Sequence, residues 1–264
     1  MHAFTELKVQ EHAVGIHWFG QSSFALKDAA GTVVQVDPYF PTERPAEKFI
    51  HDAPPLDETT LPTDYVLLTH NHRDHTWPES LLRIHAMFPA CRFVGPAESI
   101  DNLREQGVGE SQLTTVTAGE RVALGTVIAH AVWAKPPGGA PEDGIEPPDV
   151  THLGYVVEIG GVRVYISGDP INTFAEHDEL LEPIAALRPD IGFLTTHPNE
   201  GEFPYFDGSV KTALKLGLKA AVPAHYECFV KRTYDPQEWA AQFPADGPQM
   251  VIIPYNGSTV YALA

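Results

Sequence analysis

The first third of the chain alternates short apolar runs with turn-forming residues, a pattern that predicts β-strands. Three such runs predict a meander: residues 14–19, 23–27 and 32–37. Residues 40–64 are rich in proline and weakly periodic, so we expect a surface loop there. A continuous apolar run at 65–69 then predicts a strand buried on both faces, ending directly at His70.

The rest of the chain mixes helical and strand patterns. Helical spacing is found at residues 78–87 and 97–106, and strands are predicted at 113–116, 121–124 and 126–133. Gly-Gly at 160–161 predicts a hairpin formed by residues 153–159 and 162–166. Beyond it, helices at 178–187, 209–216 and 236–242 alternate with strands at 190–195, 219–223 and 250–254.

Meanders that lead into alternating helices and strands in both halves predict an α/β (α+β) fold in which two sheets pack face to face with helices outside, a four-layer αββα sandwich. No boundary divides the pattern, so residues 1–264 are predicted to form a single domain. Residues 135–149 hold five prolines, three glycines and four acidic residues, which predicts a long loop. We expect this loop to act as a lid over the functional site.

The composition limits the kinds of molecule that the protein is expected to bind. The net charge of −18, from 35 acidic and 17 basic residues, disfavours nucleic acid and anionic lipid surfaces and leaves a small-molecule substrate. Two cysteines are too few for a disulfide scaffold, and no export signal or apolar run of ~20 residues is present. These features predict a cytoplasmic protein that does not enter membranes, and they leave open whether it forms a homo-oligomer.

The candidate chemistry is concentrated directly after the strand predicted at 65–69. Three histidines and an aspartate fall within six residues: His70, His72, Asp74 and His75. Imidazole nitrogens and carboxylate oxygens are ligands of zinc, manganese and iron, and residues i and i+2 can face one ion while i+4 and i+5 face another. The pattern predicts a site for one or two divalent ions; the alternative is a polar turn or a pH-sensitive hydrogen-bonded cluster.

Several motifs in chain order resemble the metallo-β-lactamase superfamily, and within it the branch that contains L-ascorbate-6-phosphate lactonase and related metal-dependent hydrolases. Besides the His70-x-His72-x-Asp74-His75 segment, they are Trp18-Phe19-Gly20-Gln21-Ser22-Ser23-Phe24, Val36-Asp37-Pro38, Phe93-Val94-Gly95-Pro96, Tyr165-Ile166-Ser167-Gly168-Asp169 and Pro223-Ala224-His225-Tyr226-Glu227-Cys228-Phe229. They extend over nearly the whole chain.

The resemblance implies that His70 and His72 hold one ion, that Asp74, His75 and His225 hold a second, and that Asp169 bridges the two. A carboxylate suits bridging because each of its two oxygens can bind a cation. On spacing alone, Asp169 could instead cap a turn and His225 could be a hydrogen-bonded core histidine.

The chain departs from the superfamily pattern at one place. Many members carry a third histidine for the first ion after the strand that corresponds to residues 126–133, where this chain has Ala134-Lys135-Pro136. The lactonase branch also lacks a histidine there. His152 or His130 could supply the missing ligand, although a packing or hydrogen-bonding role within the strand is favoured for His130, and a one-ion site stays open.

The expected reaction is hydrolysis by a metal-activated water, with Asp74 orienting that water or accepting its proton. The expected substrate is a lactone or ester of a small sugar-derived acid, with or without a phosphate group. The alternatives are a small-molecule phosphodiesterase of the same fold and a non-catalytic metal- or ligand-binding module. Candidate substrate contacts are Lys135, His197, Asn199, Lys231 and Arg232.

Overall fold

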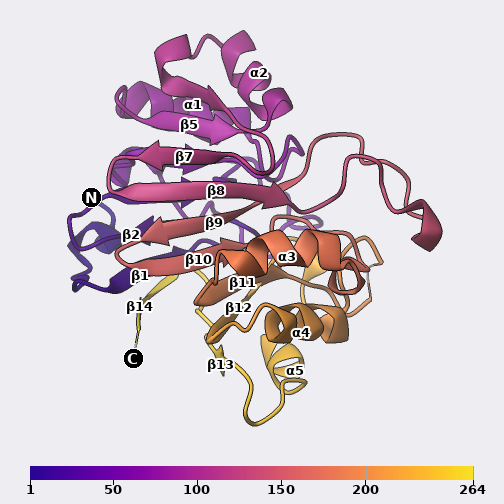
Figure 1. The fold of residues 1–264 in the computed structure, drawn as a ribbon. Helices are drawn as coiled ribbons and strands as arrows, with labels where there is room; N and C mark the ends of the chain where they lie inside the picture. The colour runs from indigo at the N-terminus through magenta and orange to yellow at the C-terminus, as the bar shows by residue number, and fades with distance from the viewer. Residues whose placement is uncertain (200, 264) are drawn as a thin grey trace.

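The computed structural model describes residues 1–199 and 201–263. Two seven-stranded sheets lie face to face, and helices cover their outer faces (Figure 1). The four-layer αββα sandwich predicted from the sequence is therefore confirmed. In each sheet, part of the strands run parallel and part antiparallel, and this mixture decides where the functional residues lie.

The first sheet has the strand order β14-β1-β2-β3-β4-β5-β6. Neighbouring strands are antiparallel from β14 to β3 and parallel from β3 to β6. The strands are β1 (Ala13–Trp18), β2 (Phe24–Lys27), β3 (Val33–Val36), β4 (Tyr65–Leu67), β5 (Arg92–Gly95), β6 (Leu113–Thr115) and β14 (Gly257–Ala262).

The second sheet has the order β13-β12-β11-β10-β9-β8-β7. It is antiparallel from β7 to β10 and parallel from β10 to β13. The strands are β7 (Arg121–Leu124), β8 (Val127–Trp133), β9 (Leu153–Ile159), β10 (Val162–Ile166), β11 (Ile191–Thr195), β12 (Ala220–Ala224) and β13 (Gln249–Met250).

Five α-helices and six short 3-10 helices connect the strands within the described residues. The α-helices are α1 (Pro78–Met87), α2 (Ala97–Glu105), α3 (Asp178–Ala186), α4 (Phe206–Lys215) and α5 (Pro236–Ala240). The 3-10 helices are η1 (Ala3–Glu6), η2 (Glu58–Thr60), η3 (Glu110–Gln112), η4 (Pro141–Asp143), η5 (Phe174–Glu176) and η6 (Val230–Arg232). Within this described part of the chain, no helix combines the length and the apolar character needed to cross a bilayer.

The main hydrophobic core fills the space between the two sheets. Alternate residues of β1, namely Val14, Ile16 and Trp18, face this core, as the period of two in a strand requires. A second core lies between α1, α2 and the strands β4 and β5. In Figure 1, α1 and α2 lie at one end of the molecule, while α3, α4 and α5 lie on the side of the second sheet.

Two strands were missed, and two expectations about the elements were wrong. Strands β5 and β14 were not predicted, because β5 begins with Arg92 and is only four residues long, and β14 alternates between half-buried and exposed residues at a sheet edge. The strand expected at 250–254 is reduced to β13. Residues 40–64 are not only surface loop, because Phe40 and Leu61 are fully buried and cover the outer face of β1 to β3.

Candidate metal centre

The order of the strands brings residues from both sheets to one edge of the sandwich. Parallel strands end at the same edge, so the residues that follow them meet there. Asp37 follows β3, the segment 69–75 follows β4, Asp169 follows β10 and His225 follows β12. A backbone hydrogen bond from the Leu153 amide to the Thr69 carbonyl joins the two sheets at this edge.

Seven residues from four separate segments form a His/Asp cluster at this edge. Their possible ligand atoms fall into three overlapping groups, within each of which the atoms lie no more than 4.8 Å apart. The groups are His70, His72 and His152; His70, His75 and Asp169; and Asp74, His75 and His225. The structure therefore brings together all six residues that the sequence predicted as ligands, together with His152.

Asp169 lies at the centre of the His/Asp cluster. Its Oδ2 atom is 3.2 Å from His75 Nε2, 3.5 Å from His225 Nε2 and 3.7 Å from His70 Nε2. These contacts place the carboxylate between the first and the third group of possible ligands. The position is the one that a bridging carboxylate would need.

His152 occupies the place left open by the absence of a third histidine after β8. The amide of Ala134, at the end of β8, donates to the carbonyl of His152, so the antiparallel pairing of β8 and β9 brings this histidine to the edge. Its ring stacks on His70 with 4.0 Å between centroids and lies edge-on to His72 at 5.0 Å. Of the two histidines that the sequence left open, it is the one that joins the cluster.

His130 lies elsewhere. It pairs with Val156 in the middle of β8 and β9, and its Nε2 atom is 2.6 Å from Glu158 Oε1. It belongs to none of the three groups of possible ligands found among the described residues. The hydrogen-bonding role that the sequence favoured for His130 agrees with this position.

Buried hydrogen bonds hold His75 in place. Its Nδ1 atom lies 2.8 Å from Oδ2 of Asp37. The same oxygen accepts a hydrogen bond from the Thr69 hydroxyl, and Oδ1 of Asp37 accepts one from the Thr69 amide. With Nδ1 facing Asp37, the lone pair available for a cation is on Nε2, and such carboxylate partners orient metal-binding histidines. No role was predicted for Asp37 from the sequence, although an Asp-Pro directly after a strand is a usable signal.

Gln21 and Asp149 contact three further members of the cluster, and neither was predicted from the sequence. Gln21 Nε2 donates to Asp74 Oδ2 at 2.8 Å and lies 2.8 Å from His225 Nε2. His72 Nε2 lies 3.1 Å from both carboxylate oxygens of Asp149, at the end of the 135–149 loop. That loop therefore contacts the cluster, as a lid would.

Burial and neighbouring charges set the protonation of the cluster. Burial lowers the pKa of His70 well below its usual range, with further lowering by His75 and His152, and burial lowers the pKa of His152 to about 3. Burial alone would lower the pKa of His75, but three nearby carboxylates raise it well above the usual value. Burial would raise the pKa of Asp169, but His225 and His75 hold it well below the usual range. His70, His152 and Asp169 are therefore held in the forms that bind cations, whereas His75 has to release its proton when a cation binds, as is general for metal ligands.

The donor set fits a divalent cation. His70 Nε2, His75 Nε2 and both ring nitrogens of His152 are buried and accept or donate no hydrogen bond within the described residues. Buried polar atoms without partners are costly and rare in proteins, so several of them within one cluster indicate a ligand. Imidazole and carboxylate without thiolate suit zinc, manganese and iron alike.

Comparisons with known proteins agree with this geometry. Residues 32–226 match the family described as the β-lactamase superfamily domain. The chain belongs to the β-lactamase superfamily. It is 26% identical over 250 residues to a UPF0173 metal-dependent hydrolase of Methanosarcina mazei, covering 93% of this chain and 97% of that protein.

Solved structures share the superfamily fold. Igni18, a metallo hydrolase of Ignicoccus hospitalis, superimposes with a TM-score of 0.72 at 20% identity, covering 96% of this chain and all (100%) of that one. An isothiocyanate hydrolase from Delia radicum gut bacteria superimposes with a TM-score of 0.70 at 16% identity, covering 94% and 99% of the two chains. The comparisons place this β-lactamase-superfamily chain among relatives described as metal-dependent hydrolases.

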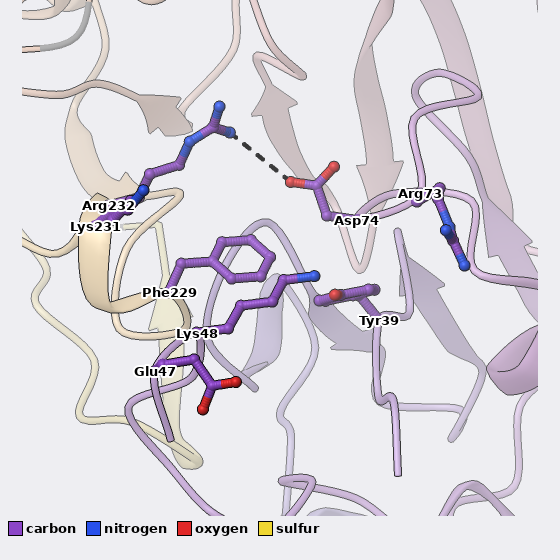
Figure 2. Close-up of a pocket in the computed structure, with 8 residues that line it drawn as sticks. All are labelled: Tyr39, Glu47, Lys48, Arg73, Asp74, Phe229, Lys231 and Arg232. Atoms are coloured by element: carbon purple, nitrogen blue, oxygen red, sulfur yellow. Dashed lines mark ion pairs between the residues drawn. The ribbon is translucent and has the colours of Figure 1, made fainter. Parts of the chain in front are cut away.

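An open cavity of about 450 Å³ lies beside the cluster in this superfamily member. Asp74 reaches it from the cluster, and Lys231 and Arg232, both predicted substrate contacts, lie on its opposite side (Figure 2). The Arg232 guanidinium is 3.1 Å from Glu202 and 4.0 Å from Asp74. Lys48 and Arg73 also line the cavity and were not predicted from the sequence.

The remaining predicted substrate contacts lie around the same edge but do not line this cavity. The charge of Lys135 is close enough to contribute to the low pKa of His152. His197 is buried, its backbone amide donates to the Pro204 carbonyl, and its Nδ1 accepts from the backbone amide of Asn199. These contacts fix the two residues in the loop after β11, and their role as substrate contacts stays a prediction.

Proposed function

We propose that the protein is a metal-dependent hydrolase that cleaves a lactone or ester bond of a small sugar-acid-like molecule. The proposal rests on one observation above all: the His/Asp cluster and the open cavity share Asp74. A cavity of about 450 Å³ has the size of typical small-molecule sites. The family relationship supports the same reading.

In this proposal two divalent cations are held in adjacent positions. His70, His72 and His152 would hold one, Asp74, His75 and His225 the other, with Asp169 shared between them. The cations supply the Lewis acidity that activates water and polarises the bond under attack. Zinc, manganese and iron are all candidates for these cations, and the proposal does not choose between them.

The protein's own residues position the reactants. Asp74 is 21% exposed in its side chain, so it reaches the cavity, where its carboxylate can orient the attacking water and take up its proton. Gln21 holds this carboxylate in position by donating a hydrogen bond to Asp74 Oδ2. The 135–149 loop, attached to His72 through Asp149 and to His177 through Asp143, would cover the cluster and limit access of bulk water.

The test combines elemental analysis with turnover. Protein purified without added metal should contain one or two equivalents of zinc, manganese or iron, and should cleave members of a panel of lactones and esters. Asp74→Asn should abolish this turnover while leaving the fold intact, whereas Glu47→Gln, which removes a carboxylate from the same cavity, should keep most of it. A folded, metal-loaded protein that cleaves no lactone or ester contradicts the proposal.

A second candidate is a small-molecule phosphodiesterase, favoured by the four cationic side chains that line the cavity. Activated water can attack phosphorus as well as a carbonyl carbon. Turnover of bis-p-nitrophenyl phosphate that exceeds turnover of every lactone and ester would favour this candidate. The third candidate, a binding module without catalysis, would be favoured if the folded, metal-loaded wild type turns over no substrate of either class, and it is excluded if Asp74→Asn abolishes a measured hydrolysis without unfolding the protein.

We propose the cytoplasm as the place of action. Cys91 and Cys228 are both free and buried, as expected of a protein that needs no disulfides. The acidic surface favours a small-molecule substrate over nucleic acid. The oligomeric state stays a prediction.

A further inference from the structure

We propose that Lys48 and Arg73 form an anion-binding subsite that holds a phosphate or carboxylate group of the substrate, away from the bond that is cleaved. The idea of a substrate rests on the proposed function, but binding of an anion at this place can be measured without any turnover. The subsite specifies the chemical class of the proposed substrate: the molecule carries a negatively charged group that takes no part in the reaction.

The subsite lies where two cavities meet. The cavity beside Asp74, of about 450 Å³, shares Tyr39, Lys48 and Arg73 with a neighbouring cavity of about 480 Å³. A ligand that reaches from the cluster into the second cavity therefore comes close to both cations. Figure 2 shows Lys48 lying between Phe229 and Tyr39, with Asp74 on the far side of the cavity.

The charge at this place is opposite to that of the protein as a whole. The chain has 17 basic and 35 acidic residues, yet the first cavity is lined by four basic residues and only two acidic ones. One of the acids is Asp74, whose charge a bound metal would offset. Such a local reversal of sign attracts small anions to the cavity of a protein that otherwise repels them.

The two cations have no carboxylate partner. Among the described residues, neither Lys48 nor Arg73 lies within 4.0 Å of an Asp or Glu oxygen, whereas Arg232 in the same cavity is paired with Glu202. The absence of such a partner leaves the charges of Lys48 and Arg73 available to a ligand. Lys231 lines the first cavity as well and is likewise without an ion pair in the described part of the chain.

Aromatic rings hold both cations without neutralising them. Lys48 Nζ lies 5.2 Å from the ring centre of Phe49 and 5.4 Å from that of Phe229, and Arg73 Cζ lies 5.0 Å from that of Trp77. Such contacts favour particular positions of the two side chains, and because both residues are exposed, their positive charges stay accessible to an anion. The arrangement favours a ligand with a flat or apolar body next to its charged group.

The test measures binding of simple probes to the full-length, metal-loaded protein by calorimetry. Phenylphosphonate and benzoate represent the phosphate and carboxylate forms of the anion, and methyl phenyl sulfone is a neutral control of similar shape. The variant is Lys48→Glu, which lies outside the His/Asp cluster. The matched control is Lys8→Glu. Lys8 is exposed and lines neither cavity, and its replacement changes the net charge by the same amount.

One charge-assisted contact contributes about 1.5–3 kcal/mol, so we expect Lys48→Glu to weaken binding of at least one anion by about 10-fold or more. Lys8→Glu should bind that anion as the wild type does, and the sulfone should bind much more weakly than either anion. The stronger of the two anions identifies the charged group of the substrate.

Three results would overturn the subsite: no binding of either anion, equal binding by Lys48→Glu and Lys8→Glu, or equal binding of the neutral sulfone. Equal binding by the two variants would assign the anion to the metal cations instead. The outcome is independent of the proposed hydrolysis, since lactone and ester turnover is measured separately and can fail while anion binding depends on Lys48.

Discussion

Replacing Asp37 by Asn should weaken metal binding by removing the charge that orients His75. Asp37 is completely buried and accepts three hydrogen bonds, from the Thr69 amide at 2.8 Å, from the Thr69 hydroxyl at 2.6 Å and from His75 Nδ1 at 2.8 Å. In the variant, the amide oxygen can still accept from the backbone amide of Thr69, but the NH2 group then takes the place of Oδ2 and faces both the His75 N–H and the Thr69 hydroxyl. One charge-assisted hydrogen bond is lost and a donor faces a donor.

The size of the effect follows from this one contact. A hydrogen bond to a charged group is worth about 1.5–3 kcal/mol, and loss of such a partner behind a metal ligand typically costs 10-fold to 100-fold in metal affinity. Burial raises the pKa of Asp37, so its carboxylate is itself costly to bury, which offsets part of the loss in stability. We therefore expect a larger change in metal affinity than in the free energy of unfolding of the metal-free protein.

Competition with a metal-binding dye measures the affinity, and urea denaturation of the metal-free protein measures stability. Asp28→Asn is the matched control, because Asp28 is also buried and accepts hydrogen bonds from the Thr32 amide and the Thr126 hydroxyl, but contacts no member of the His/Asp cluster. Metal affinity equal to that of the wild type in Asp37→Asn would refute the role given to this carboxylate.

Three further predictions follow from the same geometry. His152→Ala should lower the metal content measured by elemental analysis after dialysis, whereas His130→Ala should retain the wild-type content; equal losses would contradict the assignment. Gly168→Ala should destabilise the protein by more than ~2 kcal/mol in urea denaturation, because φ of Gly168 is +60° and a Cβ there would lie 2.4 Å from a carbonyl oxygen of β9. Gly217→Ala is the control and should cost less, because φ of Gly217 is +63° but a Cβ there would meet no atom within 4 Å. Burial lowers the pKa of His17 from 6.5 to about 4, so as the pH decreases the unfolded chain binds the proton before the folded chain does. The free energy of unfolding should therefore fall by up to ~3 kcal/mol between these two pH values. His17→Gln should flatten this dependence of stability on pH, and an unchanged slope would exclude His17 as the cause.

Much of the candidate centre was predictable because its residues stand next to strand ends. The spacing of His70, His72, Asp74 and His75 is a local property. Side chains of one short segment after a buried strand necessarily lie within a few ångströms of one another, so their grouping does not depend on the rest of the fold. Asp169 and His225 came from the resemblance, and the structure brings both to the same edge. Whether they bind metal remains the proposal tested above.

The choice between His130 and His152 could not be made from the sequence. Both lie near β8 and β9, and only the pairing register decides that Trp133 faces Leu153 while His130 faces Val156. A histidine one residue before β9 is thereby brought to the sheet edge, and one in the middle of β8 is not. Register depends on burial of both strands at once, which no single run of residues reveals.

The amino-acid sequence by itself determined the strand-rich pattern, the two-sheet architecture and the local group of ligands after β4, because these depend on neighbouring residues and on periodicity. Only the tertiary structure decided that Asp37 supports His75, that His152 completes the first group, and that Lys48 and Arg73 share a cavity wall. These contacts join residues far apart in the chain, and they exist because parallel strands of two sheets end at one edge, where packing of the whole core sets the distances.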